Sequence, residues 1–180
     1  MDRFEEKTVT SKKIFEGNII DVQLDEVMLS NGETAQRELV NHPGAVAVLP
    51  ITPDNKIVLV EQYRKPLERT LIEIPAGKLE KNENPLTAAV RELEEETGYT
   101  TTNLSQVTSF YTSPGFANEL VYIYVTNDLI RMENPPAGDD DEFVEVMEVT
   151  LDEAKDLVEE GRIQDAKTNY AILYLHALNK

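Results

Sequence analysis

The stretch from residue 77 to 99 constrains this chain more than any other. Four glutamates fill five positions near its end, since residues 92–96 read Glu-Leu-Glu-Glu-Glu. A helix is predicted to start at Asn84 and Pro85, which suit the cap and the first helical position, and to stop at Gly98. The glutamates then lie at the helix C-terminus, where the helix dipole and mutual repulsion disfavour them. Such crowding is typical of a site for hard divalent cations, which prefer clustered oxygen ligands.

Spacing within the predicted helix separates the carboxylates from the core. Glu92 and Glu96 are four residues apart and share one face, and Glu95 lies beside them. Arg91 is four residues before Glu95 and can pair with it. A solvated acidic helix face is the simpler alternative. The core-facing stripe is expected to contain Leu86, Ala89, Val90, Leu93 and Thr97.

Composition excludes several classes of function. The chain has 180 residues and a net charge of −17, so it lacks the basic surface that nucleic acid requires. It contains no cysteine, which excludes disulfides, thiolate nucleophiles and iron–sulfur clusters. No apolar run approaches the length of a membrane span, and residues 1–6 contain no apolar signal region. We therefore expect a cytoplasmic protein with no membrane or nucleic-acid partner.

The remaining pattern mixes strands and helices. Residues 7–40 are predicted to form a small β-rich segment, and 44–51 and 56–63 read as buried strands. Loops are expected at 76–83 and 132–142. Further strands are predicted at 71–75, 106–112, 120–125 and 143–149, and helices at 85–97, 151–160 and 165–178. The predicted class is α+β, with a curved mixed sheet between helices, divided into a segment 1–42 and a main domain 43–180.

The spacing of the first stretch resembles the Nudix box. That pattern is glycine, five residues, glutamate, seven residues, then Arg-Glu-aliphatic-any-Glu-Glu-any-Gly-apolar, and every fixed position from Gly77 to Tyr99 matches it, with Tyr99 a slightly polar choice at the last. The resemblance implies an α/β/α sandwich and a hydrolase of nucleoside diphosphates linked to another moiety. It also implies two or three Mg²⁺ or Mn²⁺ ions, which would offset the charge of a pyrophosphate and activate a water nucleophile.

The same resemblance assigns roles within the box. Glu92 and Glu96 would be metal ligands and catalytic residues, and Glu95 would be a ligand or the partner that orients Arg91. The backbone carbonyl of Ala76 would add another metal ligand. Glu83 would support the site rather than bind metal.

Sequences outside the box are similar to the ADP-ribose pyrophosphatase branch. Residues 113–116 read Ser-Pro-Gly-Phe, and Pro114 follows Gly98 by sixteen residues. A simple turn is the alternative explanation of Pro-Gly. The resemblance implies that this segment, Arg37 and Arg64 contact the substrate and that Glu73 binds its terminal ribose. Arginine suits phosphates because its planar fork matches their oxygens, although a surface ion pair is the alternative for each. The implied substrate-binding residues are Arg37, Arg64, Glu73, Pro114, Gly115 and Phe116.

Two further expectations follow from this branch. Glu142, in the acidic run 139–142, would complete the metal site or accept a proton from the attacking water, with Asp140 as the alternative base. A mobile solvated loop is the simpler explanation of that run. The N-terminal segment would exchange between the subunits of a homodimer and help to build the adenine pocket, with Phe15 or Ile19 lining it.

The predicted activity is metal-dependent hydrolysis of ADP-ribose to AMP and ribose 5-phosphate. The first alternative is the same chemistry on another nucleoside diphosphate sugar, such as ADP-glucose or GDP-mannose. The second is a non-catalytic ligand-sensing module, which would be expected to have lost carboxylates of the box.

Overall fold

The computed structural model describes residues 3–136, 138 and 143–179. These form two compact units, which are described separately. The first comprises the residues up to Gly44 together with Tyr111–Leu120, and the second comprises Ala45–Phe110 and the residues from Val121 onward. Along the described part of the chain, no helix is both long enough and apolar enough to cross a membrane.

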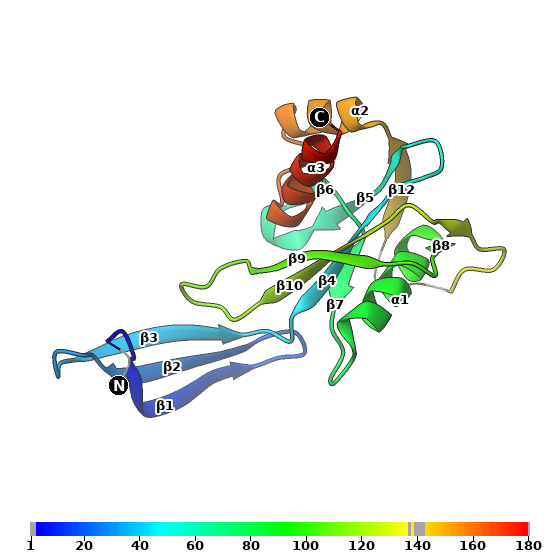
Figure 1. The fold of residues 1–180 in the computed structure, drawn as a ribbon. Coiled ribbons are helices and arrows are strands. Elements are labelled where there is room, and N and C mark those ends of the chain that lie inside the picture. The colour runs from blue at the N-terminus through cyan, green and yellow to red at the C-terminus, as the bar shows by residue number, and fades with distance from the viewer. Residues whose placement is uncertain (1–2, 137, 139–142, 180) are drawn as a thin grey trace. The chain divides into compact units, whose positions relative to one another are not determined.

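The first unit is built on an antiparallel sheet with the strand order β1-β2-β3 (Figure 1). Its strands are β1 (Lys7–Glu16), β2 (Asp21–Met28) and β3 (Thr34–Asn41), within the region predicted to be β-rich. Every residue of β1 is exposed. The segment 111–120 joins this unit through an amide of Val40, which donates to the carbonyl of Phe116 (2.8 Å).

The second unit contains a mixed sheet, an antiparallel sheet and flanking helices. In one sheet the order is β7-β4-β10-β9, with β4 and β10 parallel and β4 and β7 antiparallel; in another it is β12-β5-β6, all antiparallel. A short pair, β8 (Tyr99–Thr100) with β11 (Ile130–Arg131), was not predicted. The other strands are β4 (Ala45–Pro50), β5 (Ile57–Arg64), β6 (Arg69–Glu73), β7 (Ala76–Lys78), β9 (Ser105–Tyr111), β10 (Leu120–Thr126) and β12 (Val144–Val149), and the helices are a 3-10 turn Lys65–Leu67, α1 (Pro85–Thr97), α2 (Leu151–Glu159) and α3 (Ala166–Leu178).

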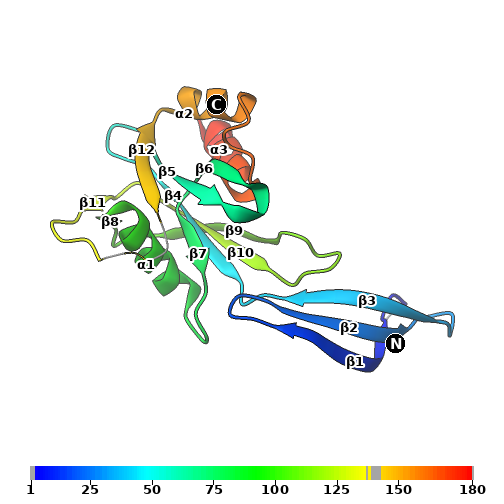
Figure 2. The same cartoon turned by 180° about the vertical axis from the view of Figure 1, so that it is seen from behind.

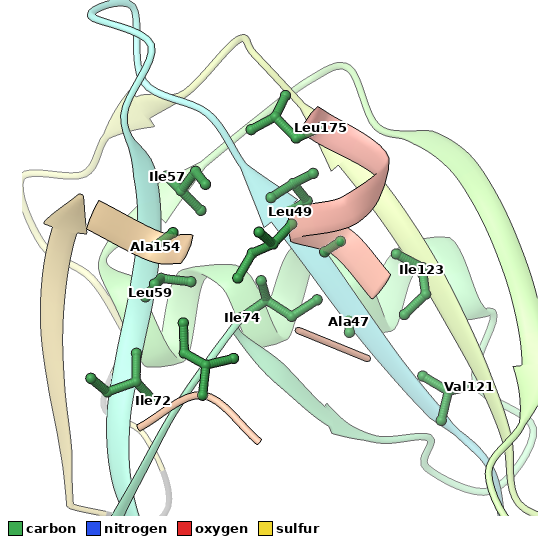
Figure 3. Packing of buried hydrophobic residues seen from close by; sticks show 13 residues of the cluster. Ala47, Leu49, Ile57, Leu59, Ile72, Ile74, Val121, Ile123, Ala154 and Leu175 are labelled. Atoms are coloured by element: carbon green, nitrogen blue, oxygen red, sulfur yellow. The ribbon is translucent and has the colours of Figure 1, made fainter. Parts of the chain in front are cut away.

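Strand β4 explains the layered arrangement, because its side chains alternate between two apolar clusters. Val46 and Val48 pack with α1, whereas Ala47 and Leu49 pack with α2 and α3. The helices consequently cover opposite faces of the sheet (Figures 1 and 2). Figure 3 shows the second cluster, in which Leu49 lies near Leu175. Each fully buried Leu or Ile side chain contributes roughly 1.5–3 kcal/mol relative to exposure. The predicted α+β class with helices on both sides of a mixed sheet is confirmed.

The helix ends follow their local sequence signals. The Asn84 side chain accepts a hydrogen bond from the amide of Leu86 (2.9 Å), and Gly98 ends α1 with φ at +69°. A reciprocal capping box between Thr150 and Glu153 starts α2. The caps at Asn84 and Gly98 place the ends of α1 where the sequence predicted them, and so fix which turn carries the glutamates.

Two local predictions were wrong. Leu86 was expected in the core, but its side chain is 46% exposed, and Ala88 is buried instead. The predicted loop 76–83 begins with a strand, β7, which pairs with β4. Among the described residues, Leu86 belongs to neither of the two apolar clusters. β7 escaped prediction because it is short and contains glycine.

Candidate active site

The last two turns of α1 bring two carboxylates under the edge of the sheet. Glu92 and Glu96 are 9% and 8% exposed. Oε2 of Glu96 accepts a hydrogen bond from the amide of Ala76 on β7 (2.8 Å), and Oε1 accepts one from Nε2 of Gln62 on β5 (3.2 Å). Buried carboxylates of this kind are costly unless they are hydrogen-bonded or bind a cation. Gln62 was not identified from the sequence, because no local signal links it to a residue 34 positions away.

Glycine at position 77 allows Glu92 to approach β7. A Cβ at this position would lie 2.0 Å from the carboxyl carbon of Glu92, well inside contact distance. The backbone of Gly77 pairs with Val46 of β4, so the strand cannot move away without breaking the ladder. The glycine of the box is therefore required by the packing of the Glu92 carboxylate.

Arg91 connects the other acidic residues of the box. Its Nη1 donates to Oε1 of Glu92 (2.8 Å) and Oε2 of Glu95 (2.9 Å), and its Nε donates to Oε1 of Glu83 (3.1 Å). The hydrogen bond to Glu83 is the largest cause that raises the pKa of Arg91, and the same bond lowers the pKa of Glu83. The predicted proximity of Arg91 and Glu95 is observed. One guanidinium thereby offsets the repulsion among three carboxylates.

The donors assembled here suit a hard cation. Glu92, Glu95 and Glu96 offer carboxylate oxygens, and Ala76 offers a backbone carbonyl, with no sulfur or imidazole among them. Across the described residues, however, no group of three or more acidic or histidine side chains is arranged to hold a metal ion. Magnesium needs only one or two carboxylates, because it keeps several waters and takes oxygens from a substrate. The donor set therefore fits a cation shared with substrate, rather than a cage formed by protein alone.

The two acidic-loop candidates cannot be placed in this arrangement. Glu142 and Asp140 both lie outside the described residues. Their predicted roles as base or ligand stay predictions.

A second polar cluster lies on β5 and β6. Arg64 donates two hydrogen bonds to Glu73, from Nε to Oε1 (2.7 Å) and from Nη2 to Oε2 (2.6 Å). Burial is the largest influence on the pKa of Glu73 and raises it, but the contacts with Arg64 and Lys167 together outweigh burial and leave the pKa lowered. Glu73 raises the pKa of Arg64, and the charge of Glu96 adds to that rise. Arg64 thus lies within electrostatic range of the candidate metal ligands.

Lys167, at the start of α3, is the residue of this cluster that the sequence analysis missed. Its Nζ donates to Glu73 and to Oδ1 of Asp165 (2.9 Å). Asp165 also caps α3 by accepting from the amide of Thr168 (3.0 Å). The cap was detectable as Asp-Ala-Lys-Thr before an apolar run, but the contact between Lys167 and Glu73 spans 94 positions. The structure gives Glu73 two cationic partners, while its predicted contact with ribose stays a prediction.

The remaining candidates belong to the first unit. Arg37 forms a two-pronged ion pair with Glu6, through Nε to Oε2 (2.8 Å) and Nη2 to Oε1 (2.6 Å). Pro114 and Gly115 lie within a turn, in which the amide of Phe116 donates to the carbonyl of Ser113 (3.1 Å). These side chains are placed within their own unit only, so their contact with a substrate stays a prediction.

Both the sequence and the fold of this chain are similar to those of known proteins. The family model of the NUDIX domain matches residues 41–170. The chain is 56% identical over 175 residues to the ADP-ribose pyrophosphatase of Bacillus subtilis (strain 168), covering 97% of this chain and 95% of the relative. It is 55% identical over 172 residues to a Bacillus methanolicus protein named methanol dehydrogenase activator, covering 96% and 93%.

The fold is similar to that of a solved structure of low sequence identity. A crystal structure of an ADP compounds hydrolase superposes with a TM-score of 0.84 at 21% identity, over 97% of this chain and 94% of the other. That likeness supports the fold, and the box residues from Gly77 to Gly98 supply the family signature within it. With the family model spanning most of its length and with relatives above half identity, this chain belongs to the Nudix hydrolase family.

Proposed function

We propose that this protein hydrolyses the pyrophosphate bond of ADP-ribose to give AMP and ribose 5-phosphate. The observation that carries the proposal is the pair of buried carboxylates, Glu92 and Glu96, held beside β7 in a chain whose near relative is named for that activity. The balanced reaction adds the oxygen of water to one phosphorus and breaks the bridging phosphorus–oxygen bond. The proton of that water passes to a carboxylate.

Divalent cations, Mg²⁺ or Mn²⁺ in two or three copies, are part of the proposal. When bound, they would neutralise the diphosphate charge and lower the pKa of the attacking water. Glu92 and Glu96 would hold them, joined by Glu95 and the carbonyl of Ala76. Arg91 would orient the carboxylates of Glu92 and Glu95 toward the cations, because it donates a hydrogen bond to each of them.

The other residues divide between proton transfer and binding. Glu142 would accept the water proton or complete the cation site, with Asp140 as the alternative base. Arg64 would bind a diphosphate oxygen, because its side chain is partly exposed and lies within electrostatic range of Glu96. The proposed substrate contacts are Arg37, Arg64, Glu73, Pro114, Gly115 and Phe116.

Assembly and location complete the proposal. A homodimer is consistent with the uniformly exposed strand β1, which carries apolar side chains such as Ile14 and Phe15. A cytoplasmic location is consistent with a chain that contains no cysteine. Light scattering and cell fractionation test these two points.

The experiment that tests the activity is hydrolysis of a substrate panel, with phosphatase added to release phosphate from the products. The panel is ADP-ribose, ADP-glucose, GDP-mannose, diadenosine polyphosphates and nucleoside triphosphates, each with Mg²⁺, Mn²⁺ or a chelator. Metal-dependent preference for ADP-ribose by about tenfold or more in kcat/KM, or about 1.4 kcal/mol, supports the proposal. Comparable rates on several nucleoside diphosphate sugars would support pyrophosphate hydrolysis but refute ADP-ribose as the specific substrate. No hydrolysis by a folded, metal-loaded protein would favour a ligand-sensing module.

A second candidate function comes from the Bacillus methanolicus relative, whose name describes an activator of another enzyme. The two activities are separable in one experiment. The protein and its Glu96→Gln variant are added to a methanol dehydrogenase assay. Stimulation by both forms would indicate a binding effect, stimulation by the native form alone would indicate that hydrolysis causes it, and no stimulation would exclude this candidate.

A further inference from the structure

We propose that Lys167 is a positioning residue that holds the Glu73 carboxylate in place when Arg64 turns from Glu73 to the diphosphate of the substrate. The inference deepens the proposed function and rests on it, because it concerns how that site releases an arginine for phosphate binding. No residue of α3 was among the candidates predicted from the sequence.

Glu73 is a buried carboxylate that has two cationic partners. Its side chain is 2% exposed, and one of its oxygens, Oε2, accepts from both Arg64 and Lys167. Removing one partner from a buried charge pair is strongly unfavourable when the remaining charge is left without another. If Arg64 were the sole partner of Glu73, movement of Arg64 toward a ligand would leave the buried Glu73 carboxylate without a counter-ion. Lys167 removes that penalty by remaining on Oε2.

The two cations that contact Glu73 differ in their exposure to solvent. The side chain of Arg64 is 37% exposed, whereas that of Lys167 is 16% exposed. Arg64 also uses only Nε and Nη2 on Glu73, and within the described residues its Nη1 has no hydrogen-bond partner. Arg64 therefore keeps a donor without a partner among the described residues, on a side chain that is more exposed than that of Lys167. Between the two, Arg64 is the cation that can reach a ligand.

Lys167 is held in place by the first turn of α3 and by Asp165. Its backbone lies in the first turn of α3, next to the capping residue Asp165, and its amine bonds Oδ1 of that residue. The other oxygen, Oδ2, is buried without a hydrogen-bond partner among the described residues, which concentrates negative charge around the amine. The adjacent Thr168 accepts from the amide of Ile74, one residue after Glu73 (3.0 Å). The hydrogen bond between Thr168 and Ile74 therefore joins the backbone next to Lys167 with the backbone next to Glu73.

A double-mutant cycle tests the proposal. Lys167→Met should raise KM for ADP-ribose by roughly tenfold, because Arg64 becomes the sole counter-ion of Glu73, while kcat changes by less than about threefold. Lys167→Arg, which keeps the charge and the donors, should restore KM. In a Glu73→Gln background, Lys167→Met should change KM by less than about twofold, because no buried charge remains to be held.

A second readout does not depend on turnover. Isothermal calorimetry with ADP-ribose in the presence of a chelator should show the same pattern in Kd. Lys155→Met is the matched control, since Lys155 also forms an ion pair, with Asp152 in the first turn of α2, but lies outside the site. Thermal melting confirms that each variant is folded, and Lys167→Gln replaces Lys167→Met if the latter does not fold.

Two results would overturn the proposal. An equal KM increase in both backgrounds would show that Lys167 touches the substrate or acts independently of Glu73. An unchanged KM in Lys167→Met, with the protein folded, would show that Arg64 needs no replacement on Glu73. If the native protein does not hydrolyse or bind ADP-ribose at all, the proposed function fails instead, which the unmodified protein reveals before any variant is made.

Discussion

Gly77 and Glu92 are packed so closely that a methyl group on residue 77 would lie 2.0 Å from the carboxyl carbon of Glu92. The atoms in conflict belong to the end of a flexible side chain, so the helix need not move, but the carboxylate must. A substitution at position 77 should therefore displace the Glu92 carboxylate without a comparable loss of stability.

Gly77→Ala should reduce turnover by roughly a hundredfold or more, because displacing an electrostatic group of the site costs about 2.7–4 kcal/mol in comparable cases. Stability should fall by less than about 2 kcal/mol, the usual range for single substitutions. Kinetics and urea denaturation measure the two quantities. Lys78→Ala, on the same strand but exposed, should change neither. Normal turnover in Gly77→Ala would show that the position of Glu92 does not matter to catalysis.

Glu96→Gln should leave the fold intact, and slightly more stable because repulsion among the helix carboxylates is relieved. Glutamine retains an oxygen that can accept from the amide of Ala76. Turnover should fall by about 10²–10⁴-fold, since a neutral amide is a poor ligand for a hard cation. Glu94→Gln, on the same helix, is the control and should retain activity. Near-normal turnover in Glu96→Gln would remove Glu96 from the metal site.

Glu142→Gln should lower kcat and leave substrate affinity within about threefold, which is the signature of a group that acts in the transition state. Single-turnover kinetics combined with ADP-ribose binding measures both. The same experiment on Asp140→Asn decides between the two carboxylates. If kcat is retained in the first variant and lost in the second, the base is Asp140.

The ion pair between the buried Glu73 and Arg64 should make stability depend on pH. The pKa of Glu73 is lowered in the folded protein from its ordinary value of 4.5, so the folded state binds its proton less readily than the unfolded state. The contribution of Glu73 to stability is therefore fully present above about pH 4.5 and is lost as pH falls through the folded pKa. Urea denaturation between pH 7 and pH 3 should show a steeper decline for the native protein than for Glu73→Gln.

Glu16→Gln, an exposed position on β1, is the control for that series. Parallel curves for the native protein and Glu73→Gln would mean that Glu73 titrates alike in the folded and unfolded chain, contrary to its burial under two cations.

What the sequence predicted best is what is encoded locally. Asn84, Gly98 and the capping box at Thr150 each act within one turn of helix, and each lies where it was expected. The apolar run 44–51 is equally local, and it predicted the buried strand β4. The spacing of Glu92 and Glu96 placed both on one face of α1, because helix geometry fixes that face without reference to the rest of the fold.

What escaped prediction depends on contacts between distant segments. Gln62 and Lys167 have no local pattern that distinguishes them, and their partners Glu96 and Glu73 are 34 and 94 residues away. The burial of Glu92 and Glu96 could not be predicted from hydrophobic periodicity either, because that periodicity assigns carboxylates to the solvent-facing side of a helix. Leu86 shows the converse, since periodicity assigned this apolar residue to the core and the structure leaves it exposed.

The alternation along β4 has a consequence for the site that lies beside it. Both faces of this strand are apolar, so a slip of one residue in its pairing would expose no charged or polar group to the core, and hydrophobic patterning alone offers little protection against it. Such a slip would nevertheless move Gly77 away from its place opposite Val46, and with it the amide that holds Glu96. Misfolded forms of this protein should therefore include compact species with near-native secondary structure that have lost catalysis, and folding yield should be scored by active-site titration rather than by circular dichroism.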